Sequence, residues 1–277
     1  MANKSNLACV VIPVYKSEPS EYEKIAYTQC LRVLYKYDIY LVVPNGFDCS
    51  YYNRFDGVEV RQFPLHFFEG LKGYNALLLS SMFFKEFLLY KYMLIYQLDC
   101  FVFRDELTKW CSMNFDYIGA PWLEVSWLYE SHKIISKNLL KKRSALIKPL
   151  VRLKWKLKGL NNPENFRVGN GGLSLRNVKS SYKATKKYKK EILTWAFSED
   201  FFYSFFLPLS GDTFVIPSAE QALYFSFDTN PNLCYKRTQF VLPFGCHGWC
   251  RTDDPYTNNL EFWLPIVKQH MKDRSIG

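Results

Sequence analysis

Apolar runs alternate with amphipathic stretches along the first part of the chain. Four segments predict strands, at 8–15, 39–44, 58–63 and 92–98, and the first of them is expected to be buried on both faces. The stretches between them predict helices over about 21–35 and 73–89. Strands that alternate with helices in this way indicate an α/β fold with a mostly parallel central sheet of the nucleotide-binding type.

The pattern continues less regularly beyond residue 99. It predicts a helix over about 105–113, a strand or turn at 117–122, a loop at 161–165 and a glycine-containing strand at 167–176. A Lys-rich helix and a further helix after Glu220 follow. We find no internal repeat and no low-complexity linker, so we expect one domain over 1–277, with halves 8–122 and 161–277 on either side of an insertion at 123–160.

Asp99 stands where the apolar run 92–98 ends, and no turn residue separates it from Cys100. A carboxylate in such a position is costly to bury without a cation or hydrogen-bond donors. In an open α/β sheet the carboxyl ends of the strands border the ligand crevice. Asp99 is therefore a candidate site residue, although capping of the next helix or pairing with a nearby Lys explains it equally well.

The composition fits a folded protein. Of the 277 residues 48% are hydrophobic and 18% aromatic, which is too apolar for a disordered chain. Eight scattered cysteines and the lack of a secretory leader indicate a reducing cytoplasm. Cys246 and Cys250 flank His247, but no second closely spaced pair completes a tetrahedral zinc site.

The net charge of +10 is concentrated in the insertion. Ten Lys or Arg and no acidic residue occur over 133–158, interleaved with apolar residues. Such a segment suits an anionic membrane surface, and a surface helix with a solvated basic face is the alternative. A second basic cluster lies over 179–190. No apolar run is long enough to cross a bilayer.

Four polar islands lie in apolar surroundings, and their order resembles the GT-A class of nucleotide-sugar glycosyltransferases. The segments 96–103, 116–122, 168–176 and 243–249 (YQLDCFVF, DYIGAPW, VGNGGLSLR and PFGCHGW) look like a bacterial glycosyltransferase family from surface-polysaccharide gene clusters. The likeness extends over about 10–249 and is specific as an ordered set. It implies a single GT-A-like domain with a Rossmann-type, mixed, mostly parallel sheet flanked by helices, 8–122 being the nucleotide-binding half and 161–277 the acceptor and catalytic half.

The resemblance also implies roles for individual residues. Asp99 and His247 would be the metal ligands for Mn²⁺ or Mg²⁺, although a core histidine is the alternative for His247. Gln97 stands where the GT-A box usually has its first Asp, so a metal-independent enzyme stays open. The implied binding residues for a UDP-sugar donor are Val14, Tyr15, Lys16, Gln97, Asp99, Asn170, Gly171 and Gly172.

Glu199 and Asp200 resemble the acidic pair that begins a helix in inverting GT-A enzymes. By that likeness Asp200 is the catalytic base and Glu199 an orienting or acceptor-binding partner. Charge at a helix N-terminus is the structural alternative. Three aromatic residues are candidate stacking walls of the sugar pocket: Tyr74, Trp122 and Trp249.

These interpretations lead to one expected function with two rivals. We expect a cytoplasmic enzyme, peripheral to the inner face of the cell membrane, that moves a sugar from a UDP-sugar to a glycan acceptor on a lipid carrier, in O-antigen or capsule synthesis. A retaining transferase of the same fold is one rival. The other is a non-catalytic basic module that binds anionic membrane or nucleic acid. The sequence contains no recognised nucleic-acid-binding motif, which argues against this module.

Overall fold

A six-stranded sheet forms the centre of the molecule. The structure is a computed structural model and describes residues 6–123, 126–252 and 258–272. The strand order is β3-β2-β1-β4-β7-β6. The strands are β1 (Ala8–Pro13), β2 (Asp38–Pro44), β3 (Val58–Phe63), β4 (Tyr92–Tyr96), β6 (Tyr117–Pro121) and β7 (Val168–Asn177). Only β7 runs antiparallel to its neighbours. The predicted α/β class with a mixed, mostly parallel sheet is confirmed.

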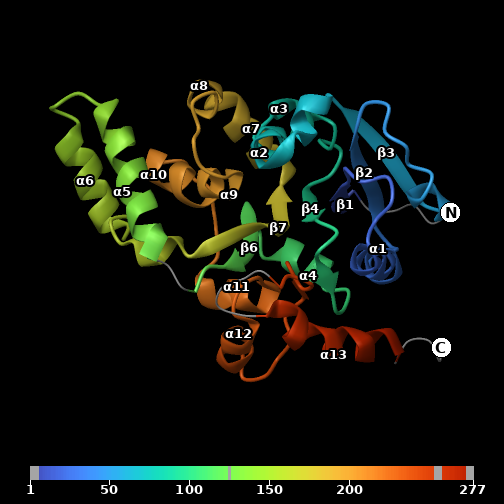
Figure 1. Cartoon of the computed structure of the whole chain (residues 1–277). Helices are drawn as coiled ribbons and strands as arrows, with labels where there is room; N and C mark the ends of the chain where they lie inside the picture. The colour runs from blue at the N-terminus through green and yellow to red at the C-terminus, as the bar shows by residue number, and fades with distance from the viewer. Residues whose placement is uncertain (1–5, 124–125, 253–257, 273–277) are drawn as a thin grey trace.

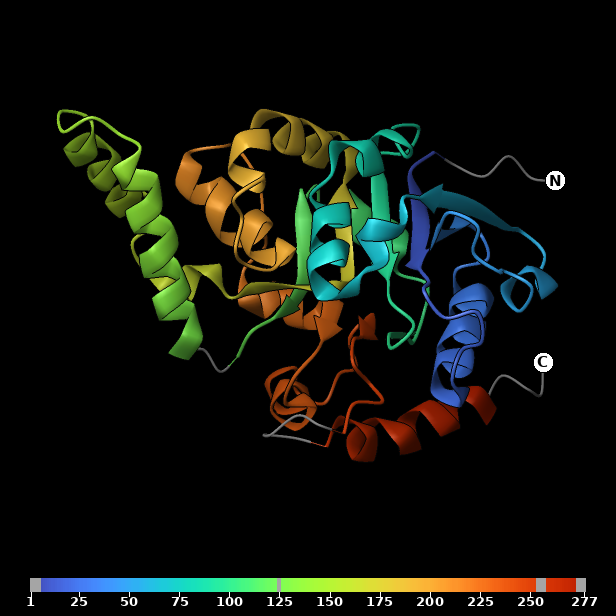
Figure 2. The ribbon, with the colours of Figure 1, turned by 45° about the horizontal axis from the view of Figure 1, so that its top comes forward.

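Helices cover both faces of this sheet (Figures 1 and 2). The first set is α1 (Glu21–Val33), α2 (Gly70–Leu78), α3 (Ser81–Lys85), α4 (Leu107–Ser112), α5 (Ser126–Lys141), α6 (Lys148–Leu157) and α7 (Val178–Lys187). The second is α8 (Lys189–Ile192), α9 (Glu199–Phe201), α10 (Leu207–Ser210), α11 (Ala219–Phe225), α12 (Pro231–Arg237) and α13 (Asn259–Lys272). Short 3₁₀ segments lie at η1 (Tyr52–Arg54), η2 (Leu65–Phe68) and η3 (Pro163–Phe166), and a π-helical turn, η4 (Phe202–Phe206), follows α9.

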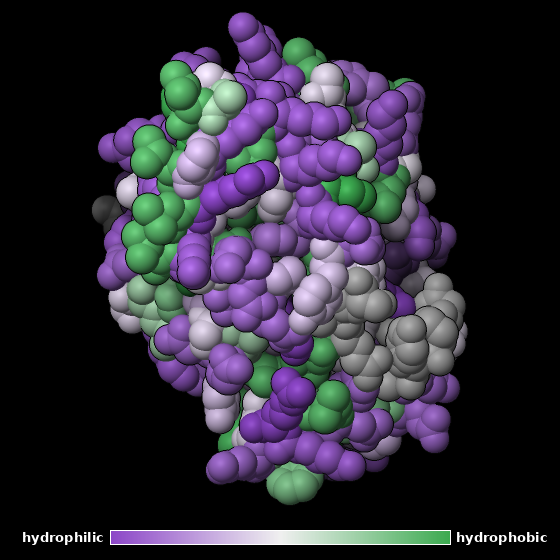
Figure 3. Space-filling model, turned by 90° about the vertical axis from the view of Figure 1, so that its left-hand side faces the viewer, coloured by the Kyte–Doolittle hydropathy of each residue, from purple (hydrophilic) through white to green (hydrophobic). Residues whose placement is uncertain are grey.

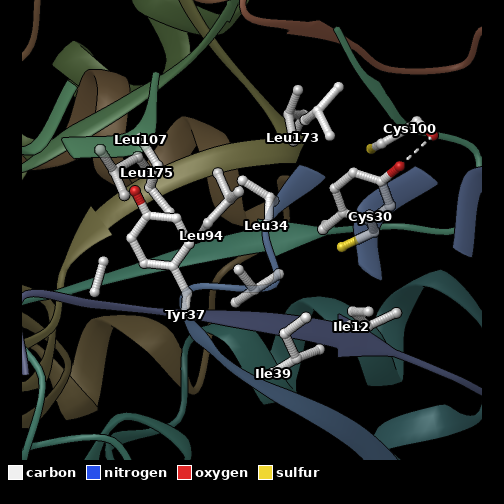
Figure 4. Close-up of a cluster of buried hydrophobic side chains, with 14 of the residues drawn as sticks. Ile12, Cys30, Leu34, Tyr37, Ile39, Leu94, Cys100, Leu107, Leu173 and Leu175 are labelled. Carbon is white, nitrogen blue, oxygen red and sulfur yellow. Dashed lines mark hydrogen bonds between the residues drawn. The ribbon is translucent and has the colours of Figure 1, made fainter. Parts of the chain in front are cut away.

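Alternate residues of the central strands pack into two separate cores. Ile12 of β1 and Leu94 of β4 face α1 and α4, in the cluster shown in Figure 4. Val11 and Ile95 point to the other face, where they pack with α2, α3 and α7. Both sides of β1 and β4 are thus buried, which explains why these strands appear in the sequence as continuous apolar runs.

A smaller three-stranded sheet joins segments that are far apart in the sequence. It consists of β5 (Phe101–Val102), β9 (Gly245–Cys246) and β8 (Ser226–Phe227), in that order. Phe101 pairs with Cys246, and Phe227 pairs with the same residue from the other side. This sheet brings the residues just before β5 next to those just after β8 and β9.

Two predicted elements differ from the structure. Asp99 lies in a turn between β4 and β5 rather than in a continuous strand. The helix expected over 73–89 begins at Gly70 and is broken after Leu78, because the hydroxyl of Ser80 caps α3 by accepting a hydrogen bond from the Met82 amide at 3.1 Å.

The basic insertion forms a helical hairpin of α5 and α6 at one end of the molecule, beyond β6 (Figure 1). The two helices are connected through residues 142–147. Within the described ranges, no helix combines the length and apolarity that crossing a membrane requires.

Candidate active site

A cleft of about 480 Å³ opens at the carboxyl ends of β1 and β4. Within the sheet, β1 has β2 as its neighbour on one side and β4 as its neighbour on the other. This is the point at which the strand order reverses, where open α/β sheets bind their ligands. The position of the cleft therefore follows from the topology.

Five residues predicted to bind a donor line this cleft together. They are Val14, Tyr15, Lys16, Gln97 and Asp99. The opposite wall comes from η2 and α2; of its residues only Tyr74 was expected from the sequence, and the others are Phe67, Phe68, Gly70 and Leu71. An apolar wall facing a polar strand end is a surface suited to a flat ring with attached charged groups.

Lys16 is not free in this structure. Its ammonium group forms an ion pair with Glu23 at 2.9 Å, and this hydrogen bond raises the pKa of Lys16. The same contact helps to hold Glu23, which completes the capping box of α1 with Ser20. A phosphate in the cleft would have to compete with Glu23 for this cation.

His247 is the centre of a buried polar cluster behind the cleft. Its Nε2 lies 3.0 Å from Gln97 Oε1 and 3.3 Å from Asp99 Oδ1, and its Nδ1 lies 2.9 Å from Asp228 Oδ1. Two of these three partners line the cleft. The structure thus brings together Asp99 and His247, the two residues predicted to share a metal ion.

The two carboxylates control the charge of this cluster. Burial alone would lower the pKa of His247, but Asp99 and Asp228 raise it to about 10. Burial opposes ionisation of Asp99, yet His247 and Arg251 bring its pKa below the ordinary value. These contacts therefore favour the protonated form of His247 and the ionised form of Asp99.

Asp228 was missed from the sequence. It follows β8 directly and is 4% exposed. Besides His247 it binds Asn170, whose Nδ2 donates to Oδ2 at 3.1 Å, and its backbone carbonyl accepts from Asn259 at 2.8 Å. Like Asp99 it follows a strand, but the segment 225–227 is short and has Ser226 at its centre, so it does not stand out as an apolar run.

Gly171 and Gly172 make room for side chains of the site. A Cβ at Gly172 would lie 2.2 Å from the His247 ring, and one at Gly171 would lie 2.0 Å from Glu199 Oε1. Asn170 fixes the strand here, because its Oδ1 accepts from the Gly172 amide at 2.9 Å. These three residues were predicted to border the donor; the structure places them under His247 and Glu199 rather than in the wall of the cleft.

Glu199 is occupied by a buried cation. Arg176 of β7 donates to both of its carboxylate oxygens, at 2.8 and 2.9 Å, and the side chains are 0% and 4% exposed. The guanidinium also lies 5.1 Å from the ring centres of Tyr117 and Tyr203. Glu199 thus compensates the charge of Arg176, and both of its carboxylate oxygens are engaged inside the protein.

Asp200 has the electrostatics of a general base. It is partly exposed, and its Oδ1 accepts from the Phe201 amide at 2.9 Å. Burial, and after it the nearby Glu199 carboxylate, raises the pKa of Asp200 to about 7. A carboxylate with such a pKa can gain and lose a proton near neutral pH. Asp200 is nevertheless not among the described residues that line the cleft.

The predicted stacking walls divide into two kinds. Tyr74 lines the cleft. Trp249 is fully buried, edge-on to Phe101 and Tyr22, and Trp122 is 7% exposed and stacks on Phe201 with ring centres 5.2 Å apart. The two tryptophans are core residues, so their prediction as walls of the sugar pocket is not supported by their positions.

Comparison with known families gives a further result. Residues 57–247, more than half of the chain, match the family described as "Protein of unknown function (DUF5672)". The chain belongs to this family. The match takes in Asp99, Asp200 and His247, whereas Val14, Tyr15 and Lys16 precede it. No curated protein matches the sequence.

Several solved glycosyltransferase structures are similar to the model. Apo GlyE of Streptococcus pneumoniae TIGR4 has a TM-score of 0.46 at 13% identity, covering 97% of this chain and 64% of GlyE. The galactosyltransferase LgtC, in complex with donor and acceptor sugar analogues, has 0.47 at 13%, covering 96% and 94%. CmsA/Ktr4 of Aspergillus fumigatus, in a Mn/GDP form, has 0.44 at 13%, covering 76% and 71%. This chain thus spans less than two thirds of GlyE, and no residue role follows from these likenesses.

Proposed function

We propose that this member of the family is a GT-A-like glycosyltransferase that moves a sugar from a UDP-sugar to a glycan acceptor. The observation that carries the proposal is the cleft at the reversal of strand order, with Gln97 and Asp99 on its wall and His247 directly behind them. The motif resemblance adds the pathway, which we take to be surface-polysaccharide synthesis on a lipid-linked acceptor.

The cleft offers separate surfaces for the parts of a nucleotide. Apolar side chains of η2 and α2 suit a base and ribose, and Gln97 can hydrogen-bond either. Lys16 lines the cleft, and its ammonium group could bind a diphosphate once its ion pair with Glu23 is broken. The buried His247 cluster lies on the same side as Asp99, so we assign the diphosphate to that end of the cleft.

Asp99 and His247 fit a divalent ion. Two ligands about 2.1 Å from one octahedral ion lie roughly 3 Å apart, and Asp99 Oδ1 and His247 Nε2 are separated by 3.3 Å. Asp228 at Nδ1 would orient the ring, as carboxylates commonly do for metal-bound histidines. Among the described residues no group of three or more Asp, Glu, Cys or His side chains is placed to hold one metal ion, so phosphate oxygens and water would complete the shell. Bound there, Mg²⁺ or Mn²⁺ would neutralise charge on the leaving diphosphate.

Asp200 is our candidate for the catalytic base of an inverting reaction. The acceptor hydroxyl oxygen would form a bond to the anomeric carbon while its proton passes to the Asp200 carboxylate. The bond from that carbon to the diphosphate oxygen would break, and UDP would leave with the electron pair. The pKa of about 7 supports this role, since half of the molecules carry the base form at that pH. Glu199 would assist by raising the pKa of Asp200 through its charge.

A retaining transferase is the second candidate. The observation that favours it is that the described lining of the cleft does not include Asp200. Determining the anomeric configuration of the product by NMR separates the two mechanisms. A product with retained configuration would remove Asp200 from the role of base.

Calorimetry of UDP binding tests the proposal as a whole. We expect UDP to bind in the presence of Mn²⁺ and to bind more weakly after Asp99→Asn, while a matched Asp56→Asn variant on an exposed loop behaves like the wild type. Absence of binding by UDP and by other nucleoside diphosphates would overturn the proposal. Absence of such binding together with tight, salt-sensitive binding of nucleic acid would favour the basic module instead.

A further inference from the structure

An apolar stripe runs along the outer face of α6 and continues to Leu146, two residues before the helix begins. Its members are spaced by four, three and four residues, which puts them on one side of a helix. They are also strongly exposed: Leu146 87%, Leu150 66%, Leu153 52% and Leu157 78%. Figure 3 shows apolar side chains gathered along one side of this end of the molecule, beside hydrophilic ones.

The stripe does not serve the packing of α6 on the protein. The helix is anchored by its opposite side, where Trp155 is 6% exposed and its indole donates to the Leu209 carbonyl at 2.9 Å. Val151, one turn earlier, packs against the same core. At about 100° per residue these two side chains point away from the leucines. The helix is thus packed on the protein through its other side, and the leucines face solvent.

Basic side chains flank the stripe on both sides. They are Lys154 and Lys158 on one side and Arg152 and Lys156 on the other, and within the described residues none of them forms an ion pair. From residue 133 to 158 the sequence contains no acidic residue. The surface therefore combines an apolar centre with a cationic border.

We propose that α6 docks this protein on an anionic lipid bilayer, with the leucine stripe in the acyl boundary and the flanking cations at the headgroups. An apolar face bordered by Lys and Arg is complementary to such a surface in both polarity and charge. A second copy of the chain would bring two cationic borders together, and nucleic acid would leave the leucines in water. The proposal does not depend on the transferase activity.

Vesicle sedimentation with the full chain tests it. The wild type is expected to bind vesicles of phosphatidylcholine mixed with phosphatidylglycerol, and at least about tenfold more weakly those of phosphatidylcholine alone. Leu150→Gln with Leu153→Gln should reduce binding to the anionic vesicles at least about tenfold. The matched control is Leu88→Gln with Leu89→Gln, two exposed leucines after α3, which should bind like the wild type.

A second pair of variants tests the charges. Lys154→Glu with Lys156→Glu should abolish the preference for phosphatidylglycerol, whereas Lys85→Glu with Lys268→Glu, of equal net charge, should keep most of it. All these side chains are exposed, so the folded state should persist, and circular dichroism checks that it does. Unchanged vesicle binding by the Leu150/Leu153 variant would overturn the proposal. So would a wild-type dimer in analytical ultracentrifugation that this variant dissociates.

Discussion

At the scale of a single residue, the role proposed for Asp200 predicts that the rate of transfer depends on pH. The base must be ionised, and its pKa is about 7, so kcat should rise with pH through that value and level off above it. Asp200→Asn, which cannot take a proton, should lower kcat by roughly 100-fold or more while UDP affinity stays within about twofold. Steady-state kinetics with a buffer series measures both; a wild-type rate independent of pH between about 5.5 and 8 would contradict the role.

The same residue should cost stability above neutral pH. Its folded-state pKa is raised above the ordinary 3.8, so the folded protein holds a proton that the unfolded chain releases, and stability falls as pH rises from about 4 to 7. Asp200→Asn removes this loss. We expect the variant to gain about 1–3 kcal/mol in the free energy of unfolding at pH 8 and little at pH 4, measured by urea denaturation.

Neutralising Glu199, the neighbour of Asp200, should destabilise the protein rather than stabilise it, because Glu199 pairs with Arg176. Glu199→Gln leaves a buried guanidinium without its counter-charge and should cost about 3–5 kcal/mol in the free energy of unfolding. Arg176→Met combined with Glu199→Met should cost clearly less than the sum of the single substitutions. Additive losses in urea denaturation would show that the two side chains do not act as a pair.

At the scale of elements, the cap of α3 is a separable contribution. Ser80→Ala removes the acceptor for the Met82 amide and should destabilise the protein by about 1 kcal/mol, because α3 holds the fully buried Phe83 and Phe84. Ser81→Ala, inside the first turn of the same helix, is the matched control and should be nearly neutral. Equal effects of the two substitutions on the thermal midpoint would argue against a capping role.

The sequence was most informative about elements and less so about their contacts. Central strands such as β1 and β4 were predictable because burial on both faces requires continuous apolar runs. The break at Ser80 was not, because a serine inside a helical pattern does not itself show which amide it will cap. Asp99 was found from its position at the end of an apolar run and His247 from the motif resemblance, whereas Asp228 follows a strand of only two residues, β8, whose partner is the equally short β9.

At the scale of the whole molecule, ligand binding should stabilise the fold by mass action. UDP with Mn²⁺ at about 100 times its dissociation constant should add roughly 2.7 kcal/mol, which corresponds to about 5–10 °C for a chain of this size. Differential scanning fluorimetry measures the shift, and uridine is the control because it lacks the diphosphate. A shift as large with uridine would show that the polar cluster does not contribute to binding.

Because β7 runs antiparallel to β6, the two strand ends that flank the helical hairpin lie side by side. β6 and β7 are adjacent strands, and Pro121 pairs with Val168 at the edge of the sheet that also carries the cleft. The Trp122 amide closes this ladder by donating to the Arg167 carbonyl at 2.7 Å. The chain enters and leaves the hairpin at these two adjacent positions. The segment between Trp122 and Arg167 can therefore be exchanged or lengthened without altering any strand pairing. Substitutions or insertions in the hairpin could therefore change the surface on which the protein docks, while the strands that carry the proposed site stay unchanged.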